Sequence, residues 1–175
     1  SIIDNGHTIQ VDLKTGDTVA TDAGKYTLVQ FHFHGPSEHT VAGKPYPLEV
    51  HFVHKDAAGK LAVVGVLVSE GEANAAYDSL VANLPHEPNK AVTLTAPIDV
   101  EAMLPHVQAT YRYSGSLTTP PCTEGVAWNV IAQPITMSKA QIAAFTGAFA
   151  EPNNRPTQKL GSRSLVVDTA VAVGH

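Results

Sequence analysis

The stretch that decides the fold is "KYTLVQFHFHGPSEHT", residues 25–40. Apolar and polar side chains alternate along its first ten residues, which is the period of a β-strand with one buried face. Because side chains two apart share a face, Gln30, His32 and His34 lie together, while Phe31 and Phe33 point to the other side. Two imidazoles on one face of an apolar strand indicate a chemical role rather than a packing role.

A second stretch repeats this pattern and supplies a third imidazole. In "PLEVHFVHK", residues 47–55, the same period places Glu49 and His51 on one face, with Val53 next along. If the two strands pair, His32, His34 and His51 converge. Three histidines with an open fourth position are a known ligand set for catalytic zinc. Ligand histidines give their other ring nitrogen to an amide, a carboxylate or a backbone carbonyl.

Those partners are present in the same two strands. Gln30 precedes His32 by two residues and Glu49 precedes His51 by two, so each lies beside its histidine on the shared face. For His34 the partner has to be a backbone carbonyl, which the sequence does not identify. The residues alone therefore predict a zinc site in which His32, His34 and His51 are the ligands.

Two other interpretations compete with this one. A histidine in a strand is most often an ordinary core or surface residue, and a His-x-His pair alone is weak evidence for a metal. The spacing His32-x-His34-x3-Glu38 also resembles the first half of the cupin signature, whose His, His and Glu bind iron or manganese. Cupins then require a Pro-x-Gly-x-x-His motif, which is missing from this sequence, so a cupin-type metal enzyme remains a remote alternative.

The rest of the chain predicts a mainly β protein with a few short helices. Turn-forming clusters separate the apolar runs, and "DAAGK" is a good hairpin loop. Two segments have helical spacing, 71–84 and 138–151, and Ser138 is a natural N-cap for the second. The tail from Leu160 onward fits an edge strand or a loop. The strands expected are 7–13, 25–34, 47–55, 60–69, 92–97, 108–116 and 124–135.

Composition sets limits on size and partners. The 175 residues are 43% hydrophobic and 15% charged, which suits one globular domain with a substantial core. A net charge of −5 without a Lys/Arg run argues against a nucleic-acid surface. No apolar stretch approaches the roughly 20 residues that span a bilayer, and no signal peptide is visible. The single cysteine, Cys122, is either a small buried group or the partner of a cysteine elsewhere.

A later stretch carries a specific resemblance. "YSGSLTTPPCTEGVAWNVIAQPI", residues 113–135, together with "QFHFH", "SEHT", "LEVHFVH" and "LAVVGVL", closely resembles the α-class carbonic anhydrases, the bacterial ones in particular. The resemblance runs from "DNGHTIQV" to "NNRPTQKLGSR". It implies a large, twisted, mostly antiparallel (mixed) central sheet with short surface helices. It also implies reversible hydration of carbon dioxide to bicarbonate and a proton by zinc-bound hydroxide, with one Zn²⁺ per chain.

The resemblance also assigns roles to residues. His32, His34 and His51 match the zinc ligands, with Gln30 and Glu49 as the residues that orient them. Thr118 matches the threonine that accepts a hydrogen bond from the hydroxide. Glu38 matches the glutamate that accepts a hydrogen bond from the hydroxyl of that threonine. His7 matches the histidine that carries protons to solvent, which suits an imidazole, because its ordinary pKa lies near 6.5. The carbon dioxide pocket matches Val53, Val63, Leu117, Thr119, Val126 and Trp128.

Further expectations follow from the same resemblance. His39, His54 and Arg155 match structural positions, whereas His86, His106 and His175 are expected at the surface. Anions and sulfonamide-type inhibitors are expected ligands, and the location is expected to be periplasmic or secreted.

The family domain starts several tens of residues before "NGH", so the chain is expected to be a single domain, 1–175, that lacks this N-terminal segment. Bacterial members carry there the cysteine that pairs with the position of Cys122. An inactive or impaired module, and association with another chain or a dimer, are the alternatives that follow.

Overall fold

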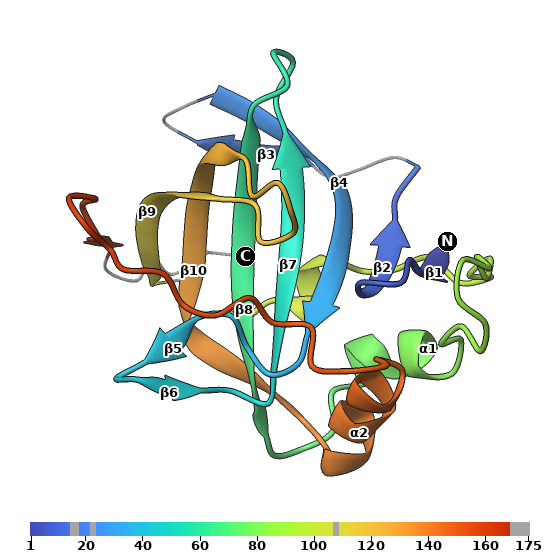
Figure 1. Ribbon diagram of the computed structural model, residues 1–175. Helices are drawn as coiled ribbons and strands as arrows, with labels where there is room; N and C mark the ends of the chain where they lie inside the picture. Colours follow the sequence, from blue (N-terminus) through green and yellow to red (C-terminus); the bar gives the residue numbers. More distant parts are fainter. Residues whose placement is uncertain (15–17, 22–23, 107–108, 169–175) are drawn as a thin grey trace.

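A computed structural model of the chain describes residues 1–14, 18–21, 24–106 and 109–168. Figure 1 shows a large twisted sheet with the long strands at its centre and the short helices at one end. The sheet order is β1-β2-β4-β7-β8-β10-β9-β11, and β3 also pairs with β4. Its strands are β1 Ile2–Asp4, β2 Ile9–Asp12, β3 Thr18–Thr21, β4 Gly24–His34, β7 Leu48–Lys55, β8 Leu61–Glu70, β9 Thr110–Ser116, β10 Glu124–Met137 and β11 Val166–Asp168.

The sheet is mixed, with a single parallel pairing between described strands, that of β10 with β8. The remaining pairings are antiparallel, as the sequence predicted. The hairpin expected at "DAAGK" is present, because β7 and β8 pair antiparallel and Gly59 in the turn has a φ of +86°. A small second sheet, β5 Thr40–Val41 and β6 Lys44–Pro45, extends from the loop after β4.

The two faces of the central strands have different neighbours. Phe31 and Phe33 are fully buried on one face, in the larger hydrophobic core. There Phe145 of helix α2, Lys139–Gly147, stacks on Phe33 with ring centroids 4.2 Å apart. A smaller cluster, which includes Val53, Val63 and Trp128, packs on the other face. The apolar residues of β4 therefore pack in the larger core on one face of the sheet. Its histidines lie on the opposite face, which is the face of the smaller cluster.

Some sequence predictions were wrong. Segment 92–97 forms no strand and makes an isolated bridge from Val92 to Ile2 at the sheet edge. Pro97 has no N–H with which to continue a ladder there. The helix expected over 71–84 is reduced to a 3-10 turn, Ala75–Tyr77, followed by α1, Asp78–Val81. It starts late because the side chain of Asn74, as N-cap, accepts the Ala76 N–H.

Other boundaries moved by a few residues. Helix α2 begins after Ser138, as predicted, with a complete capping box to Gln141, but it ends at Gly147 rather than at 151. Strand β2 is shorter than 7–13, so His7 lies in a turn. Of the strand predicted at 108–116, residue 108 lies outside the described part, and β9 covers Thr110–Ser116. The tail supplies an edge strand, β11, and the sequence missed β1, β3, β5 and β6. A second 3-10 turn covers Glu101–Met103.

Candidate metal centre

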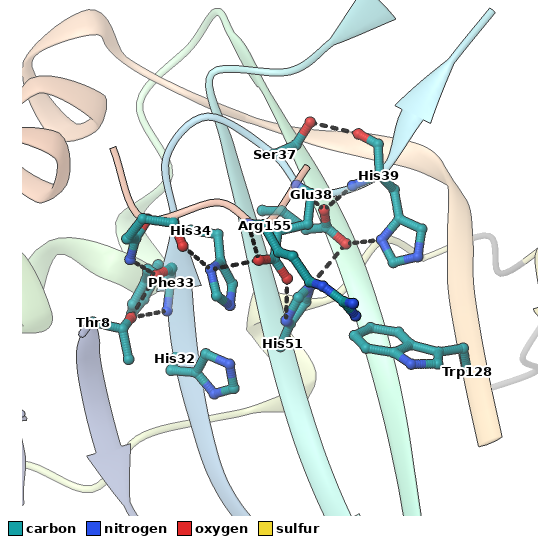
Figure 2. A network of polar contacts seen from close by, with 12 residues as sticks. Thr8, His32, Phe33, His34, Ser37, Glu38, His39, His51, Trp128 and Arg155 are labelled. Carbon is teal, nitrogen blue, oxygen red and sulfur yellow. Dashed lines mark hydrogen bonds and ion pairs between the residues drawn. The ribbon is translucent and has the colours of Figure 1, made fainter. Parts of the chain in front are cut away.

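The three histidines converge because β4 and β7 pair in one particular register. His32 lies directly opposite His51, and His34 lies opposite Glu49. Ring centroids are separated by 5.0 Å between His32 and His34, by 5.3 Å between His32 and His51, and by 4.5 Å between His34 and His51. One ligand atom from each ring lies within 4.8 Å of those from the other two. Figure 2 shows the three rings turned toward one another.

One nitrogen of each ring is bound to the protein. Nδ1 of His32 is 2.8 Å from Oε1 of Gln30, and Nε2 of His51 is 2.9 Å from Oε1 of Glu49. Nδ1 of His34 faces the backbone oxygen of Asn153 at 3.2 Å. These contacts leave Nε2 of His32, Nε2 of His34 and Nδ1 of His51 on the side where the rings meet. The arrangement fits a metal with two Nε2 ligands and one Nδ1 ligand.

The protonation state also suits a metal. Burial, with the neighbouring His51, lowers the pKa of His34 to about 3, and burial also lowers the pKa of His32 well below its usual value. Both imidazoles are therefore neutral at neutral pH, which is the form that binds metals. Nε2 of His34 is buried without a hydrogen-bond partner among the described residues. An orphaned lone pair of this kind is costly unless something coordinates it.

Glu49 is a fully buried carboxylate whose oxygens are well supplied with donors. Its Oε2 accepts the backbone N–H groups of Glu38 and His39, each at 2.9 Å, and its Oε1 meets His51 and Nδ1 of His39, the latter at 2.6 Å. Burial alone would raise the pKa of Glu49, but these histidines hold it well below its usual value. His39, Glu49 and His51 also lie close enough to hold a metal. Their facing atoms are already hydrogen-bonded to one another, however.

Glu38 lies beside the rings of His34 and His51, with its Oε1 3.4 Å from Nδ1 of His34, and Thr118 lines the cavity next to the three rings. Oε1 of Glu38 accepts the backbone N–H of Arg155 at 2.7 Å, and its Oε2 is 3.9 Å from Nδ1 of His51. Burial raises the pKa of Glu38, while His51, the Arg155 N–H and the Thr118 hydroxyl act to lower it. Oε2 of Glu38 is buried without a hydrogen-bond partner within the described ranges.

A cavity of about 310 Å³ opens over the imidazoles. The rings of His32, His34 and His51 line it together with Thr118 and Thr119. An apolar wall consists of Val53, Leu61, Val63, Leu117 and Trp128. Val126, also expected in this wall, lies behind it: the residue is 2% exposed and packs in the cluster with Val53 and Trp128 without lining the cavity.

His7 lies at the rim of the same cavity. It is exposed and lies in the turn before β2, where its N–H donates to Oδ1 of Asn5 at 3.0 Å. The structure thus brings His7 to the same cavity that His32, His34 and His51 line. Gln10 and Leu61 line the cavity too, although sequence reasoning assigned them no role.

The other histidines and the cysteine largely match expectation. His54 is buried, with Nδ1 2.9 Å from the Phe52 oxygen, whereas His39 is only partly buried. His86 and His106 are exposed, and His175 lies outside the described residues. Cys122 is a free, half-buried thiol. Arg155 donates to the Ser116 hydroxyl at 3.1 Å.

Sequence reasoning did not identify Asn153 as the partner of His34. The two residues are 119 positions apart, so no spacing rule connects them. The only sequence signal was the "NNRP" motif, in which Arg155 had been noted.

Comparison with known proteins places the chain in a family. Residues 1–169 match the family model of eukaryotic-type carbonic anhydrase. The carbonic anhydrase of Klebsiella pneumoniae is 45% identical over 168 residues, which are 95% of this chain and 68% of that protein. The α-carbonic anhydrase of Thermovibrio ammonificans, solved with the inhibitor sulfanilamide, superposes with a TM-score of 0.91 at 46% identity, covering 94% of this chain and 73% of that one.

A second solved structure agrees at lower identity. Carbonic anhydrase Cah3 of Chlamydomonas reinhardtii, solved with acetazolamide, has a TM-score of 0.87 at 36% identity, covering 95% of this chain and 76% of that one. The fold and the matched length define a class of enzymes built on a twisted mixed sheet. The chain belongs to the α-class carbonic anhydrase family, whose members hydrate carbon dioxide. No described helix is long and apolar enough to cross a membrane.

Proposed function

We propose that this chain binds one zinc ion through His32, His34 and His51 and hydrates carbon dioxide reversibly to bicarbonate and a proton. The observation that carries the proposal is the buried, unpartnered Nε2 of His34, which lies where the imidazoles of His32, His34 and His51 converge. A zinc ion bound there supplies Lewis acidity, which in carbonic anhydrases generally lowers the pKa of a water molecule from 15.7 to about 7.

Thr118 and Glu38 are proposed to orient the attacking oxygen. The Thr118 hydroxyl would accept a hydrogen bond from that oxygen and donate its own hydrogen to the Glu38 carboxylate. Thr118 lines the cavity, and its hydroxyl is among the groups that oppose the rise of the Glu38 pKa on burial, which supports the pairing of these two side chains. The ordering aims a lone pair of the oxygen at the substrate carbon, because the oxygen's hydrogen is held by Thr118.

The apolar wall is proposed to hold the substrate. Carbon dioxide is linear, uncharged and poorly hydrated, so it requires an apolar surface beside the nucleophile rather than charged contacts. Val63, Leu117 and Trp128 offer such a surface on one side of the imidazoles, with Val53 beside them. Val126 supports the wall from behind, and Thr119 lines the cavity next to Thr118.

His7 is proposed to carry the released proton from the cavity to solvent. Its position is consistent with this role, since it is exposed and at the rim of the cavity. Sulfonamide-type compounds and small anions are proposed inhibitors, because two similar structures were solved with sulfanilamide and acetazolamide. A periplasmic or secreted location is proposed from resemblance alone, and fractionation of the native host would test it.

Replacement of Thr118 tests the orientation step. We expect Thr118→Val to lower kcat/KM for carbon dioxide hydration by about 10²-fold, the usual contribution of a positioned proton acceptor and donor. Thr118→Ser should restore most of the activity because it keeps the hydroxyl. Thr123→Val, an exposed threonine of the same turn, is the matched control. Equal rates for Thr118→Val and the control in stopped-flow assays would contradict the proposed role.

A further inference from the structure

Phe33, between ligands His32 and His34, lies opposite Val50 of β7, but on the side toward β2 its backbone N–H and C=O are held by side chains. The described pairing of β2 with β4 ends at Gln10 opposite His32. One step further, the Thr8 hydroxyl accepts the Phe33 N–H at 3.1 Å and donates to the Phe33 oxygen at 2.5 Å. Thr8 is 6% exposed, so one buried hydroxyl forms hydrogen bonds with both the N–H and the C=O of Phe33 (Figure 2).

Asn153, from a loop near the other end of the sequence, also forms a hydrogen bond with the Phe33 oxygen. Its side-chain amide donates to the Phe33 oxygen at 2.9 Å and to the His7 oxygen at 3.0 Å. Its Oδ1 accepts the Gly35 N–H at 2.8 Å, and its own backbone oxygen faces Nδ1 of His34. All the polar groups of this side chain are therefore engaged, and they connect a ligand strand to the turn that carries His7.

The turn itself is tied internally. Oδ1 of Asn5 accepts the N–H groups of His7 and Thr8, each at 3.0 Å, and the Asn5 N–H donates to the Thr8 oxygen at 3.1 Å. These hydrogen bonds join the residues of the turn into one unit. Its connections to the strand of ligands are the Thr8 hydroxyl and the Asn153 amide, which meet at the Phe33 oxygen.

We propose that Thr8 and Asn153 are positioning residues that set where His7 lies relative to the metal site. We call the two side chains and the Phe33 peptide the Phe33 clamp. The inference rests on the proposed function, because it assigns the clamp to proton transfer through His7. Neither side chain has to touch the substrate. Transfer through ordered groups depends steeply on geometry, and a displacement of about 1 Å costs up to roughly 10²-fold in rate.

Amide hydrogen exchange on the metal-free chain tests the anchor without any activity. Thr8→Val keeps the branched shape but removes the hydroxyl, so the Phe33 N–H loses its acceptor. We expect the Phe33 amide to exchange at least about fivefold faster, the scale of one hydrogen bond. Thr8→Ser should retain wild-type protection. Thr27→Val, at an exposed position of the same strand, is the control. Unchanged exchange in Thr8→Val would overturn the clamp.

Steady-state hydration by the zinc-loaded chain tests the role. Thr8→Val should lower kcat several-fold while kcat/KM stays within about twofold, and Asn153→Asp, which loses both amide donors at the same size, should also lower kcat several-fold. Added imidazole should restore kcat. In a His7→Ala background, Thr8→Val should cause no further loss of kcat. A parallel fall in kcat/KM in Thr8→Val, or an additive loss of kcat without His7, would overturn the positioning role.

The two levels of failure are distinguishable. A zinc-loaded wild-type chain that hydrates no carbon dioxide would refute the proposed function and with it the proton-transfer role of the clamp. Faster Phe33 exchange in Thr8→Val would still establish the anchor in that case. Normal hydration by the wild type with unaltered kcat in Thr8→Val and Asn153→Asp would refute the clamp alone.

Discussion

Each proposed ligand imidazole has one nitrogen in a hydrogen-bond contact with the protein and the other directed to the point where the three rings meet. The partners in these contacts are Gln30, Glu49 and the Asn153 carbonyl. Each fixes both the tautomer and the ring orientation of its histidine. The three partners differ in kind: an amide, a carboxylate and a backbone oxygen. Of the two side-chain partners, Gln30 is the easier to remove, since Glu49 also accepts from the Glu38 and His39 backbone.

Removal of the Gln30 amide should weaken metal binding. Gln30→Leu leaves Nδ1 of His32 without its acceptor, and losses of such orienting groups typically cost 10- to 100-fold in metal affinity or activity. We expect a zinc dissociation constant raised by about this factor in a chelator-competition titration. Gln30→Glu should retain an acceptor and bind zinc more tightly than Gln30→Leu. Wild-type affinity in Gln30→Leu would show that the amide does not orient the ring.

His54 should contribute a pH dependence to stability that is separate from the metal. Burial lowers the pKa of His54, outweighing its bonds to the Phe52 and Ala62 backbone. In the window below the unfolded value of about 6.5 the unfolded chain binds the extra proton, so the free energy of unfolding falls as pH decreases. His54→Gln should flatten the slope between about pH 6.5 and 5 in urea titrations of the zinc-loaded chain. The exposed His86→Gln serves as the control, and equal slopes for both variants would refute the assignment.

At the scale of elements, the strands with one polar and one apolar face could be predicted from the sequence. The alternation in β4 and β7 gave the shared face of His32, His34 and His51, and the structure places them in one register. Short edge strands such as β1 and β3 carry too few residues to show a period. The isolated Val92 bridge likewise depends on its partner Ile2 rather than on local pattern.

The parts of the site that escaped prediction are those that depend on tertiary contact. Asn153 reaches His34 from a loop far along the chain, and the Phe33 peptide is closed by Thr8 only because β2 stops pairing with β4 one step earlier. The place of Val126, which packs with Trp128 and does not line the cavity, also depends on tertiary contact. Sequence alternation puts a residue on a face, but whether that residue meets the cavity or packs behind Trp128 depends on neighbouring strands.

In strand β8, a glycine leaves room for the carboxylate that orients His51. Gly65 lies opposite His51, and a Cβ there would come within 2.9 Å of Oε1 of Glu49 and 3.5 Å of Val130. Gly65→Ala should therefore displace the carboxylate that orients His51, and we expect zinc affinity to fall by about 10- to 100-fold. Gly147→Ala meets no atom within 4 Å and is the matched control. Unaltered chelator-competition curves for Gly65→Ala would mean that the strands yield without moving Glu49.

At the scale of the whole molecule, the sheet separates stability from chemistry. The larger core, with Phe31, Phe33 and Phe145, lies on one face, while the imidazoles and the cavity lie on the other. Ligand residues are thus mounted on strands whose opposite faces are tightly packed, so the site is held rigid by contacts that do not touch it. The chain spans 68% of the Klebsiella pneumoniae relative, and this region contains the complete set of proposed ligands.

Zinc content measured beside carbon dioxide hydration tests the central claim most directly. We predict one zinc per chain by elemental analysis and hydration by stopped flow, with both lost on chelation and restored by added zinc. His34→Gln, which removes the orphaned nitrogen, should lose zinc while the fold persists in circular dichroism. Failure of the wild-type chain to take up zinc after remetallation, or zinc binding without any hydration, would contradict the account.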